Sequence, residues 1–577
     1  MVKGGILLKG GIKMPTLELK VERLERLLGK KLNIKDLEYD LQWIGLDLES
    51  INEKENKIKV EYSPNRPDFS SPEGIARTLK GYYELELGAP IYKVNPGSLE
   101  INVDPVVNKV RPFIVGGVIR NIDLDEDEVA TLMNIQEDLH WALGRDRKKV
   151  AIGVHDLDKI VPPYLYTAVK PDSCKFRALQ LEHFELTPAE ILEEHPKGIK
   201  YAHILEGKEV YPIIFDKNNE VISFPPIING ILTMVTDDTK NLFIDITGTD
   251  FRAINYTLNI LSTTLSDMGA KIESVKVNYN EDGRQIITPD LKLMKWTVSK
   301  KYINDYIGVN LSETEMIKCF QKVRFNAKPS GEKGKIDIWV PAFRVDIMHE
   351  VDFVEECAIG YGYFNLPTTI REGCIGEFHP FQDYCNKIRK IMIGAQYLEV
   401  VNFMLTNSER HYNFMKREYN LKDHIQILNP KSKELDTTRT HLLPVLMENL
   451  LFNRSEEKPI KIFEVGEIIE LDLSTETGAR QELHLAAASY HENSNFTEIR
   501  SLLDHLTISL GINEKIKVIP TNSPTYIEGR VGKILYNDES IGIIGEINPE
   551  VILNFNLEFP VAALEVNINK FPGKQLI

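Results

Sequence analysis

Apolar residues recur at helical spacing, with charged residues between them, in two segments of the N-terminal half of the chain. The first segment predicts a helix shortly after Met14. The second predicts a helix that begins in the acidic run 123–128 and ends at Gly144. The apolar positions are Val21, Leu24, Leu27 and Leu28 in the first helix, and Leu132, Ile135, Leu139 and Leu143 in the second.

Short apolar runs between and after these helices predict strands. The runs are Val150–Val154, Tyr211–Phe215, Leu242–Ile246, Lys461–Val465, Lys533–Leu535 and Ile541–Gly545. Strands mixed with helices indicate an α+β fold class. At about 100–200 residues per domain, the 577 residues predict three to five domains, so the fold is expected to be multidomain.

The pattern divides the chain into five expected segments. Residues 1–13 lack an apolar core and a cleavage site, so we interpret them as an extension before a more natural start at Met14. The others are a small N-terminal domain (14–98), an α+β domain (99–281), a short mixed domain (282–367) and a larger domain in which helices alternate with strands (368–577).

Composition narrows the class of protein. Asp and Glu number 85 against 69 Lys and Arg, a net charge of −16, which excludes a free-standing nucleic-acid coat protein because phosphate neutralisation needs clustered cations. The five cysteines contain no CxxC pair, which indicates a reducing cytosol rather than a zinc site or a disulfide framework. The longest weakly polar run, Val221–Val235, is too short to span a membrane, so we expect a cytoplasmic protein.

A cluster of carboxylates follows the strand-like segment that ends in WVPAFR. Asp346 comes first, and Asp352, Glu355 and Glu356 lie at positions i, i+3 and i+4 of a predicted helix, so that one face carries three of them. Such charges repel one another unless a cation neutralises them, and hard oxygen ligands suit Mg²⁺ better than zinc. A solvated acidic helix face is the alternative, and spacing alone leaves it open.

The stretch PAFRVDIMHEVDFVEECAIGYGYFNLP (341–367) resembles the signature of phenylalanyl-tRNA synthetase β chains. The resemblance covers the chain from Met14 onward, and its other matching segments are Ser63–Arg77, Gly144–Ile160, Ser223–Asp250, Leu428–Leu446, Ile462–Ile469 and Gly542–Ile552. The oligonucleotide-binding insertion and extra C-terminal domain of long bacterial-type β chains are missing from this pattern. The short archaeal/eukaryotic type is therefore expected.

The resemblance implies a subunit of phenylalanine–tRNA ligase, a class II aminoacyl-tRNA synthetase. The β chain would pair with a catalytic α subunit in an α₂β₂ tetramer that charges tRNA(Phe), with ATP bound on α. Segment 99–281 is implied to be an α/β editing domain that hydrolyses mischarged Tyr-tRNA(Phe). Segment 282–367 would be winged-helix-like, and segment 368–577 a class II-like pseudo-catalytic core with an antiparallel sheet. The family's magnesium ion maps onto Asp346, Asp352, Glu355 and Glu356.

An editing site is needed because an apolar pocket rejects an added hydroxyl by only about 10². The resemblance maps this site onto Ile214, Ser223, Asp245 and Thr247, and alternation along FIDIT turns the last two toward one side of a strand. We assign Asp245 to the phenolic hydroxyl, Ser223 and Thr247 to the amino group, the ester or the attacking water, and Ile214 to the ring wall, where the family has Leu. Alternatively, Ser223 starts a turn and Asp245 only orders backbone.

The last segment lacks one of the two arginines that a working class II site needs. Arg439 could hold the α-phosphate, but IGEINPEV stands where a glycine-rich turn and a second arginine are expected. Loss of such a cation costs several powers of ten in rate, so Arg439 is interpreted as structural. The basic cluster Arg145–Lys149 either guides the tRNA acceptor end or complements a helix dipole.

Two other functions remain open from the sequence. One is a stand-alone Mg²⁺-dependent hydrolase that uses the carboxylates of residues 346–356, although that stretch offers no nucleophile or general acid. The other is a structural heteromer scaffold whose editing pocket has decayed. Retention of Asp245 and Thr247 argues against the second.

Overall fold

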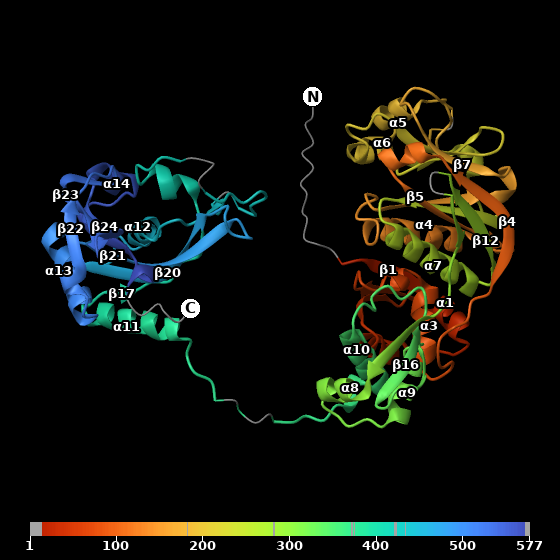
Figure 1. Ribbon diagram of the computed structural model, residues 1–577, viewed down its shortest axis with the longest axis horizontal. Helices are drawn as coiled ribbons and strands as arrows, with labels where there is room; N and C mark the ends of the chain where they lie inside the picture. Colours follow the sequence, from red (N-terminus) through yellow and green to blue (C-terminus); the bar gives the residue numbers. More distant parts are fainter. Residues whose placement is uncertain are drawn as a thin grey trace. The chain divides into compact units, whose positions relative to one another are not determined.

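The computed structural model describes residues 14–571 except 182, 281–282, 371–372, 374, 420–423 and 433. The chain divides into two compact units, Met1–Thr369 and Ile370–Ile577, which Figure 1 draws from red to green and from green to blue. Each unit combines helices and strands, which confirms the predicted α+β, multidomain fold class. The finer domain boundaries remain a prediction. Within the described part of the chain, no helix is long and apolar enough to cross a membrane.

A small antiparallel sheet with strand order β1–β3–β2 begins the first unit. The predicted helix is α1 (Val21–Leu28), which buries Val21, Leu24 and Leu28. It stops at Gly29, whose φ of 67° is left-handed and suits glycine. The remaining elements are β1 (Thr16–Lys20), α2 (Ile34–Trp43), β2 (Leu46–Asn52), β3 (Lys57–Tyr62) and α3 (Pro72–Tyr82).

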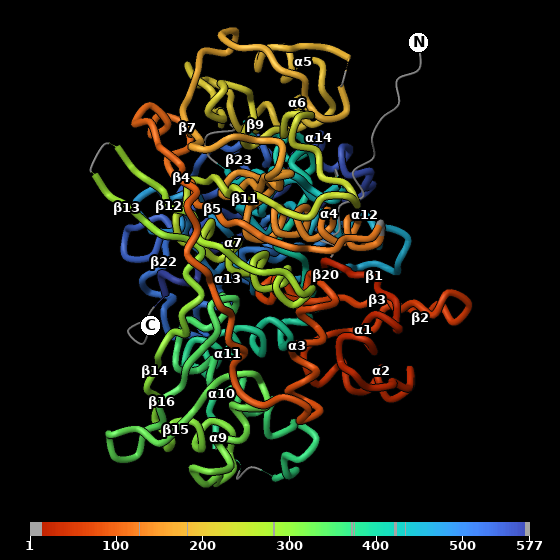
Figure 2. Tube along the Cα trace, turned by 90° about the vertical axis from the view of Figure 1, so that its right-hand side faces the viewer, coloured from red at the N-terminus to blue at the C-terminus, as the bar shows by residue number. Residues whose placement is uncertain are grey.

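A ten-stranded sheet follows, with strand order β10–β9–β8–β7–β4–β12–β5–β11–β6 and β13 paired to β12. Figure 2 shows β4, β12, β5 and β11 side by side. The strands are β4 (Val94–Val103), β5 (Phe113–Arg120), β6 (Val150–Asp156), β7 (Tyr164–Val169), β8 (Tyr211–Phe215), β9 (Val221–Phe224), β10 (Ile228–Asn229), β11 (Asn241–Gly248), β12 (Lys271–Tyr279) and β13 (Arg284–Thr288). The sheet curls, as a hydrogen bond between its terminal strands shows: Asn229 in β10 donates to the Val154 carbonyl in β6 at 3.4 Å. Its two terminal strands thus face each other.

Helices α4 (Glu126–Trp141) and α7 (Phe251–Asp267) pack on this sheet and share one hydrophobic core with β5, β6 and β11 (Figure 1). A capping box between Asp125 and Glu128 starts α4. The predicted stripe of α4 is buried, but the helix ends at Trp141 rather than Gly144 because residues 142–148 form turns. The short helices α5 (Pro188–Glu194) and α6 (Pro196–Tyr201) pack near β8 and β9.

The rest of the first unit has a core of its own, built from three helices and a sheet of order β14–β16–β15. These elements are β14 (Met294–Ser299), α8 (Lys300–Ile307), α9 (Glu313–Lys322), β15 (Asn326–Pro329), β16 (Lys335–Val340) and α10 (Glu350–Tyr361). The carboxylate cluster begins after β16 and continues into α10, as the sequence predicts.

The second unit contains a seven-stranded sheet of order β17–β20–β21–β25–β24–β23–β22. All its neighbouring strands are antiparallel except β17 and β20. Helices α11 and α13 pack on one face, and α12 and α14 on the other. The bounds are α11 (Pro380–Gly394), β17 (Leu398–Glu399), β18 (Leu405–Thr406), β19 (Thr437–Thr438), α12 (Leu443–Phe452), β20 (Ile460–Leu471), β21 (Ala479–Tyr490), α13 (Phe496–Ser509), β22 (Ile516–Pro520), β23 (Tyr526–Tyr536), β24 (Glu539–Ile547), α14 (Pro549–Asn554) and β25 (Val561–Asn567).

Candidate functional site

A cavity of about 330 Å³ lies where the terminal strands of the ten-stranded sheet face each other. Strand β6, helix α4 and the connection from β9 to β10 contribute to its walls. Its volume is at the lower end of the range for small-molecule sites, about 300–1,000 Å³. The apolar part of the lining is Met133, Ala151, Ile152, Val154, Leu179, Pro225, Pro226, Ile227, Ile228, Met234 and Val235.

Two of the four predicted site residues, Ser223 and Asp245, line this cavity. Ser223 is 3% exposed and donates a hydrogen bond from Oγ to Asn229 Oδ1 at 3.0 Å. Asp245 is 1% exposed and lies on β11, opposite Gly153 of β6. Asp245 and Ser223 therefore face a cavity with a large apolar share in its lining, although Glu137, Arg147 and Lys197 also line it. Such a space suits a ligand with an aromatic body and several polar groups.

The other two predicted residues lie outside the cavity lining. Ile214 pairs with Ser223 across β8 and β9, but its side chain is fully buried in a hydrophobic core. Thr247 lies on β11, two residues beyond Asp245, and its Oγ1 accepts a hydrogen bond from Arg111 Nε at 3.0 Å. The Arg111 guanidinium is itself buried, and burial lowers its pKa to about 10. Ile214 and Thr247 thus lie next to lining residues without lining the cavity themselves.

His155 is a contact of Asp245 that sequence reasoning missed. Its Nε2 lies 2.6 Å from Asp245 Oδ2 and its Nδ1 lies 2.8 Å from Thr233 Oγ1. These distances resemble those of a catalytic triad, but Thr233 is 1% exposed and does not line the cavity. Thr233 therefore cannot reach a ligand as a nucleophile, and the row of hydrogen bonds holds Asp245 in place. Along β6, Gly153 and His155 are two residues apart and lie opposite FIDIT of β11. This alternation is the sequence signal that could have identified His155.

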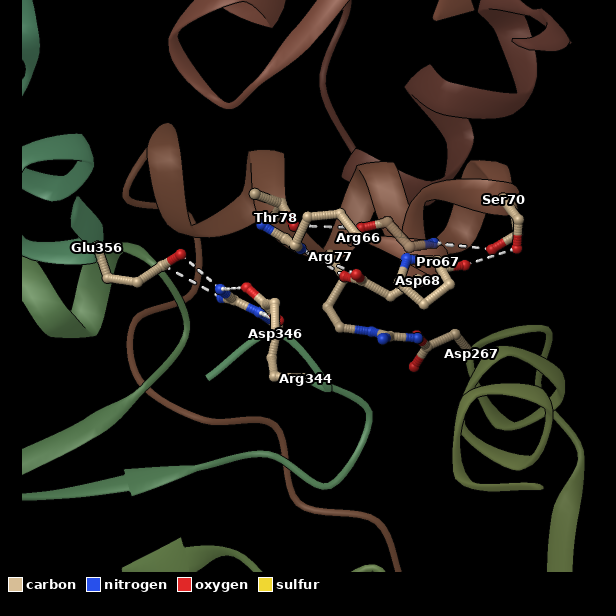
Figure 3. Close-up of polar contacts among 12 residues, drawn as sticks. Arg66, Pro67, Asp68, Ser70, Arg77, Thr78, Asp267, Arg344, Asp346 and Glu356 are labelled. Atoms are coloured by element: carbon tan, nitrogen blue, oxygen red, sulfur yellow. Dashed lines mark hydrogen bonds and ion pairs between the residues drawn. The ribbon is translucent and has the colours of Figure 1, made fainter. Parts of the chain in front are cut away.

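The Arg344 guanidinium lies between two of the predicted metal ligands, Asp346 and Glu356 (Figure 3). Its guanidinium donates to both oxygens of Asp346, at 2.8 and 2.6 Å, and to both oxygens of Glu356. All three side chains are largely buried. Burial alone would raise the pKa of the Asp346 carboxyl, but the adjacent guanidinium lowers it to about 2. Two of the four carboxylates therefore share one internal cation, which offsets one of their two negative charges.

The other two carboxylates differ in their surroundings. Asp352 Oδ2 accepts hydrogen bonds from the backbone N–H groups of Met348 and His349, at 2.6 and 2.7 Å, and so caps α10. Partial burial and the neighbouring carboxylates raise the pKa of Glu355, which marks excess negative charge. This donor set fits a hard divalent cation in its chemistry. As placed, however, no three His, Cys, Asp or Glu side chains among the described residues converge to hold a metal ion.

Three domain families match consecutive parts of the chain. They are described as "B3/4 domain" (126–268), "tRNA synthetase B5 domain" (296–363) and "Phenylalanyl tRNA synthetase beta chain CLM domain" (366–568). The phenylalanine–tRNA ligase beta subunit of Methanococcus aeolicus is 40% identical over 565 residues, 96% of this chain and 100% of that one. The same subunit of Methanocaldococcus jannaschii is 40% identical over 560 residues, again 96% and 100%. The chain belongs to the family of phenylalanine–tRNA ligase β subunits.

Membership confirms the resemblance seen in the sequence and makes this β chain part of an aminoacyl-tRNA synthetase family. Its first unit also has a solved relative, the crystal structure of an N-terminal fragment of the phenylalanyl-tRNA synthetase beta subunit from Pyrococcus horikoshii. That fragment is 36% identical, with a TM-score of 0.58 over 60% of this chain and 99% of the fragment.

The signature segment Ser63–Arg77 of this β chain connects three parts of the first unit (Figure 3). Arg77 pairs with Asp267 at the end of α7, with 2.6 Å between Nη2 and Oδ2, and stacks on the Phe343 ring at 4.0 Å. Arg66 pairs with Asp68 at 2.9 Å and contributes to the lowered pKa of Asp346. These contacts tie the segment to the end of α7 and to the loop that follows β16.

The predicted basic cluster of the β chain divides into structural and exposed residues. Arg147 is buried and donates hydrogen bonds to the carbonyls of Pro226 and Ile227, so it holds a wall of the cavity. Lys149 pairs with Asp250 at 2.9 Å. Arg145 and Lys148 are exposed. Only the exposed pair is placed to meet a phosphate backbone.

Arg439 of the second unit has the structural role that its sequence context suggests. It is 4% exposed, pairs with Glu464 at 2.7 Å and donates from Nε to the Glu467 carbonyl at 2.8 Å. The segment after β24, where a second arginine would be needed, starts α14 with Asn548 as its N-cap. A guanidinium engaged in this way is not available for the α-phosphate of ATP.

Proposed function

We propose that this β chain hydrolyses tyrosine from mischarged tRNA(Phe) in the cavity at Asp245, and that it supports charging of tRNA(Phe) with phenylalanine by an α subunit. The observation that carries the first part is the meeting of Asp245 and Ser223 in one apolar-walled cavity. Asp245 would accept the phenolic hydroxyl, and the apolar walls would hold the ring. Phenylalanine would leave that carboxylate unpaired, and sites built to bind a hydroxyl reject the analogue lacking it by about 10⁴–10⁵.

Water is the nucleophile in this proposal. Among the described lining residues, the hydroxyl of Ser223 bonds an amide oxygen rather than a general base, so no side chain is activated for attack. Water adds to the ester carbonyl, the bond to the ribose oxygen breaks, and free tyrosine and uncharged tRNA leave. Ser223 is placed to orient the amino group, the ester or the water. Thr247 and Ile214 contribute through the walls they support.

The second unit supplies the partner surface in this proposal. Its seven-stranded, largely antiparallel sheet would be a class II-like core that cannot bind ATP, since Arg439 is engaged by Glu464. Catalysis of charging would therefore fall to the α subunit, in an α₂β₂ tetramer with tRNA(Phe) in the cytoplasm. The three-stranded sheet with α8, α9 and α10 would be the winged-helix-like part.

Co-expression with the α chain of the same genome tests the proposal. Charging of tRNA(Phe) with phenylalanine is measured with each subunit alone and with both, and loss of tyrosine from preformed Tyr-tRNA(Phe) is measured in parallel. We expect charging only from the mixture, together with clearance of tyrosine. An inert mixture, or an isolated chain that hydrolyses an unrelated substrate, would contradict the proposal.

Gly153 makes room for the carboxylate, so Gly153→Ala is expected to damage editing selectively. A Cβ at this position would lie 2.0 Å from Asp245 Oδ2 and 2.5 Å from His155 Nε2, so the pair must shift. We expect Tyr-tRNA(Phe) hydrolysis to fall at least about tenfold, since displacing catalytic groups by 1 Å costs up to about 10². Gly331→Ala, which meets no atom within 4 Å, is the matched control. Equal hydrolysis by both variants would contradict this placement.

We further propose that Asp346, Asp352, Glu355 and Glu356 hold a Mg²⁺ ion, which when bound supplies positive charge between these groups. Partial burial and the neighbouring carboxylates raise the pKa of Glu355, because both disfavour its charged form. Without metal, Glu355→Gln removes this unfavourable charge and should stabilise the protein. With metal, the same change removes a ligand. Thermal unfolding of the complex in chelator and in Mg²⁺ should therefore show a melting temperature that rises with Mg²⁺ in the wild type and barely changes in Glu355→Gln.

Glu332→Gln serves as the control for this experiment, because Glu332 is exposed and pairs with Lys335 of the same hairpin. The control should respond to Mg²⁺ as the wild type does. If Mg²⁺ leaves the wild-type melting temperature unchanged and isothermal titration detects no binding, the metal proposal fails.

A further inference from the structure

We infer that His155 is a positioning residue for editing, which holds one oxygen of Asp245 so that the other faces the tyrosyl phenol. This inference rests on the proposed hydrolysis of Tyr-tRNA(Phe) at Asp245. Beyond that proposed function, discrimination between tyrosine and phenylalanine depends on the His155 side chain, although this side chain never touches the substrate.

The imidazole of His155 is fixed by contacts of both ring nitrogens and of one ring face. Its side chain is fully buried, and both ring nitrogens are engaged, Nε2 by Asp245 Oδ2 at 2.6 Å and Nδ1 by Thr233 Oγ1 at 2.8 Å. Its ring stacks against Phe243, with 5.8 Å between ring centroids and 27° between planes. Thr233 is fixed in turn, since its Oγ1 lies 3.2 Å from the Gly230 carbonyl. The imidazole therefore has one orientation available.

Two arrangements of the hydrogens are possible along Asp245, His155 and Thr233. If Thr233 donates to Nδ1, the imidazole is neutral and Nε2–H donates to Asp245. If Thr233 donates to Gly230 instead, Nδ1–H donates to Thr233, and a second proton is still needed between Nε2 and Oδ2 at 2.6 Å. In both arrangements Oδ2 is occupied. Among the residues that the structure describes, the hydrogen bond found for this carboxylate is the one to Oδ2, and Asp245 lines the cavity. Oδ1 is therefore the oxygen that can accept the phenolic hydroxyl.

Several charged or titratable groups surround this pair. Asp245 interacts electrostatically with Arg111 and Tyr166, and burial together with this carboxylate raises the pKa of that tyrosine. Across the cavity, α4 contributes Glu137 and His140, the following turn contributes Arg147, and α6 contributes Lys197. Burial lowers the pKa of His140 well below its ordinary range, so that imidazole is neutral. His155 is the group that donates to the carboxylate itself.

Removal of His155 should therefore release Asp245 from its fixed orientation. A hydrogen bond to a charged group contributes about 1.5–3 kcal/mol, which corresponds to about 10–100-fold in rate. The expected signature is slower hydrolysis of Tyr-tRNA(Phe) that a side chain able to donate the same hydrogen bond restores.

The test compares His155→Leu and His155→Gln in the complete αβ complex. Deacylation of preformed Tyr-tRNA(Phe) and Phe-tRNA(Phe) is measured at neutral pH, and phenylalanine charging serves as the folding control. For His155→Leu we expect Tyr-tRNA(Phe) hydrolysis to fall about 10–100-fold and charging to stay unchanged. The glutamine variant, whose amide N–H can replace Nε2–H, should recover most of the loss.

The outcomes separate this inference from the function on which it rests. If the wild type clears tyrosine and Asp245→Ala does not, but His155→Leu keeps the wild-type rate, the positioning role is wrong and the editing site stands. If both His155 variants lose activity equally, so that glutamine restores nothing, the role is only structural and the inference is overturned. If the wild type itself clears no tyrosine, both the proposed function and the inference fail.

Discussion

Asp245→Ala is expected to lower kcat/KM for Tyr-tRNA(Phe) hydrolysis at least about 100-fold while leaving phenylalanine charging by the complex within about twofold. The reason is that Asp245 is the carboxylate of an otherwise mostly apolar cavity floor, with one oxygen bound by His155 and the other facing the space. Without it, the phenolic hydroxyl loses its acceptor. The measurement is single-turnover deacylation of preformed Tyr-tRNA(Phe).

Asp158→Asn is the matched control for this substitution. Asp158 follows the same strand β6, but its side chain pairs with Asn241 outside the cavity. Its loss should leave both hydrolysis and charging unchanged. If Asp245→Ala deacylates Tyr-tRNA(Phe) as fast as the wild type and as the control, the assignment of the cavity to tyrosine is wrong.

Arg344→Met is expected to cause the largest loss of stability, about 3–5 kcal/mol, because it leaves buried carboxylates without their cation. Arg344 is 3% exposed, and its partners Asp346 and Glu356 are 11% and 5% exposed. Denaturant unfolding followed by tryptophan fluorescence reports on the relevant unit. All four tryptophans, Trp43, Trp141, Trp296 and Trp339, lie in residues 1–369.

The same variant should show a characteristic pH dependence. The guanidinium lowers the pKa of Asp346 from its ordinary 3.8 to about 2, so the folded state favours the ionised carboxylate. The stabilisation it provides is fully present above about pH 4 and is lost as the pH falls toward 2. We therefore expect the stability difference between wild type and Arg344→Met to shrink over that range.

Lys301→Met supplies the comparison, since Lys301 and Asp305 form an exposed ion pair on α8. Surface pairs of this kind contribute little, so its unfolding curve should match that of the wild type. A wild-type curve for Arg344→Met as well would show that the buried network does not stabilise the first unit.

The periodic elements of this chain are readable from its sequence. The stripes of α1 and α4 and the strand Tyr211–Phe215 follow from spacing alone, because burial of one helix face or of a whole strand leaves a regular pattern. The strand predicted at Lys533–Leu535 is the C-terminal part of the longer β23. Exposed residues 528–530 break the apolar run before it, so only this part was predicted.

The contacts of the site are less predictable, because they depend on pairing between strands and on buried ion pairs. His155 and Asp245 are 90 residues apart and meet only through the register of β6 and β11. Arg344 lies two residues before Asp346 in the quoted signature, but the sequence does not reveal that its side chain turns toward the carboxylates. Ile214 and Thr247 lie beside lining residues, but burial in a core and the bond to Arg111 engage their side chains, which the sequence does not reveal.

In the proposed function, the cavity at Asp245 distinguishes tyrosine from phenylalanine on tRNA(Phe). The most direct test is the ratio of deacylation rates for preformed Tyr-tRNA(Phe) and Phe-tRNA(Phe), measured with the wild-type αβ complex under identical conditions. We predict that the tyrosyl ester is cleared at least about 100-fold faster, and that the ratio collapses in Asp245→Ala. Equal rates for the two esters in the wild type would contradict the account.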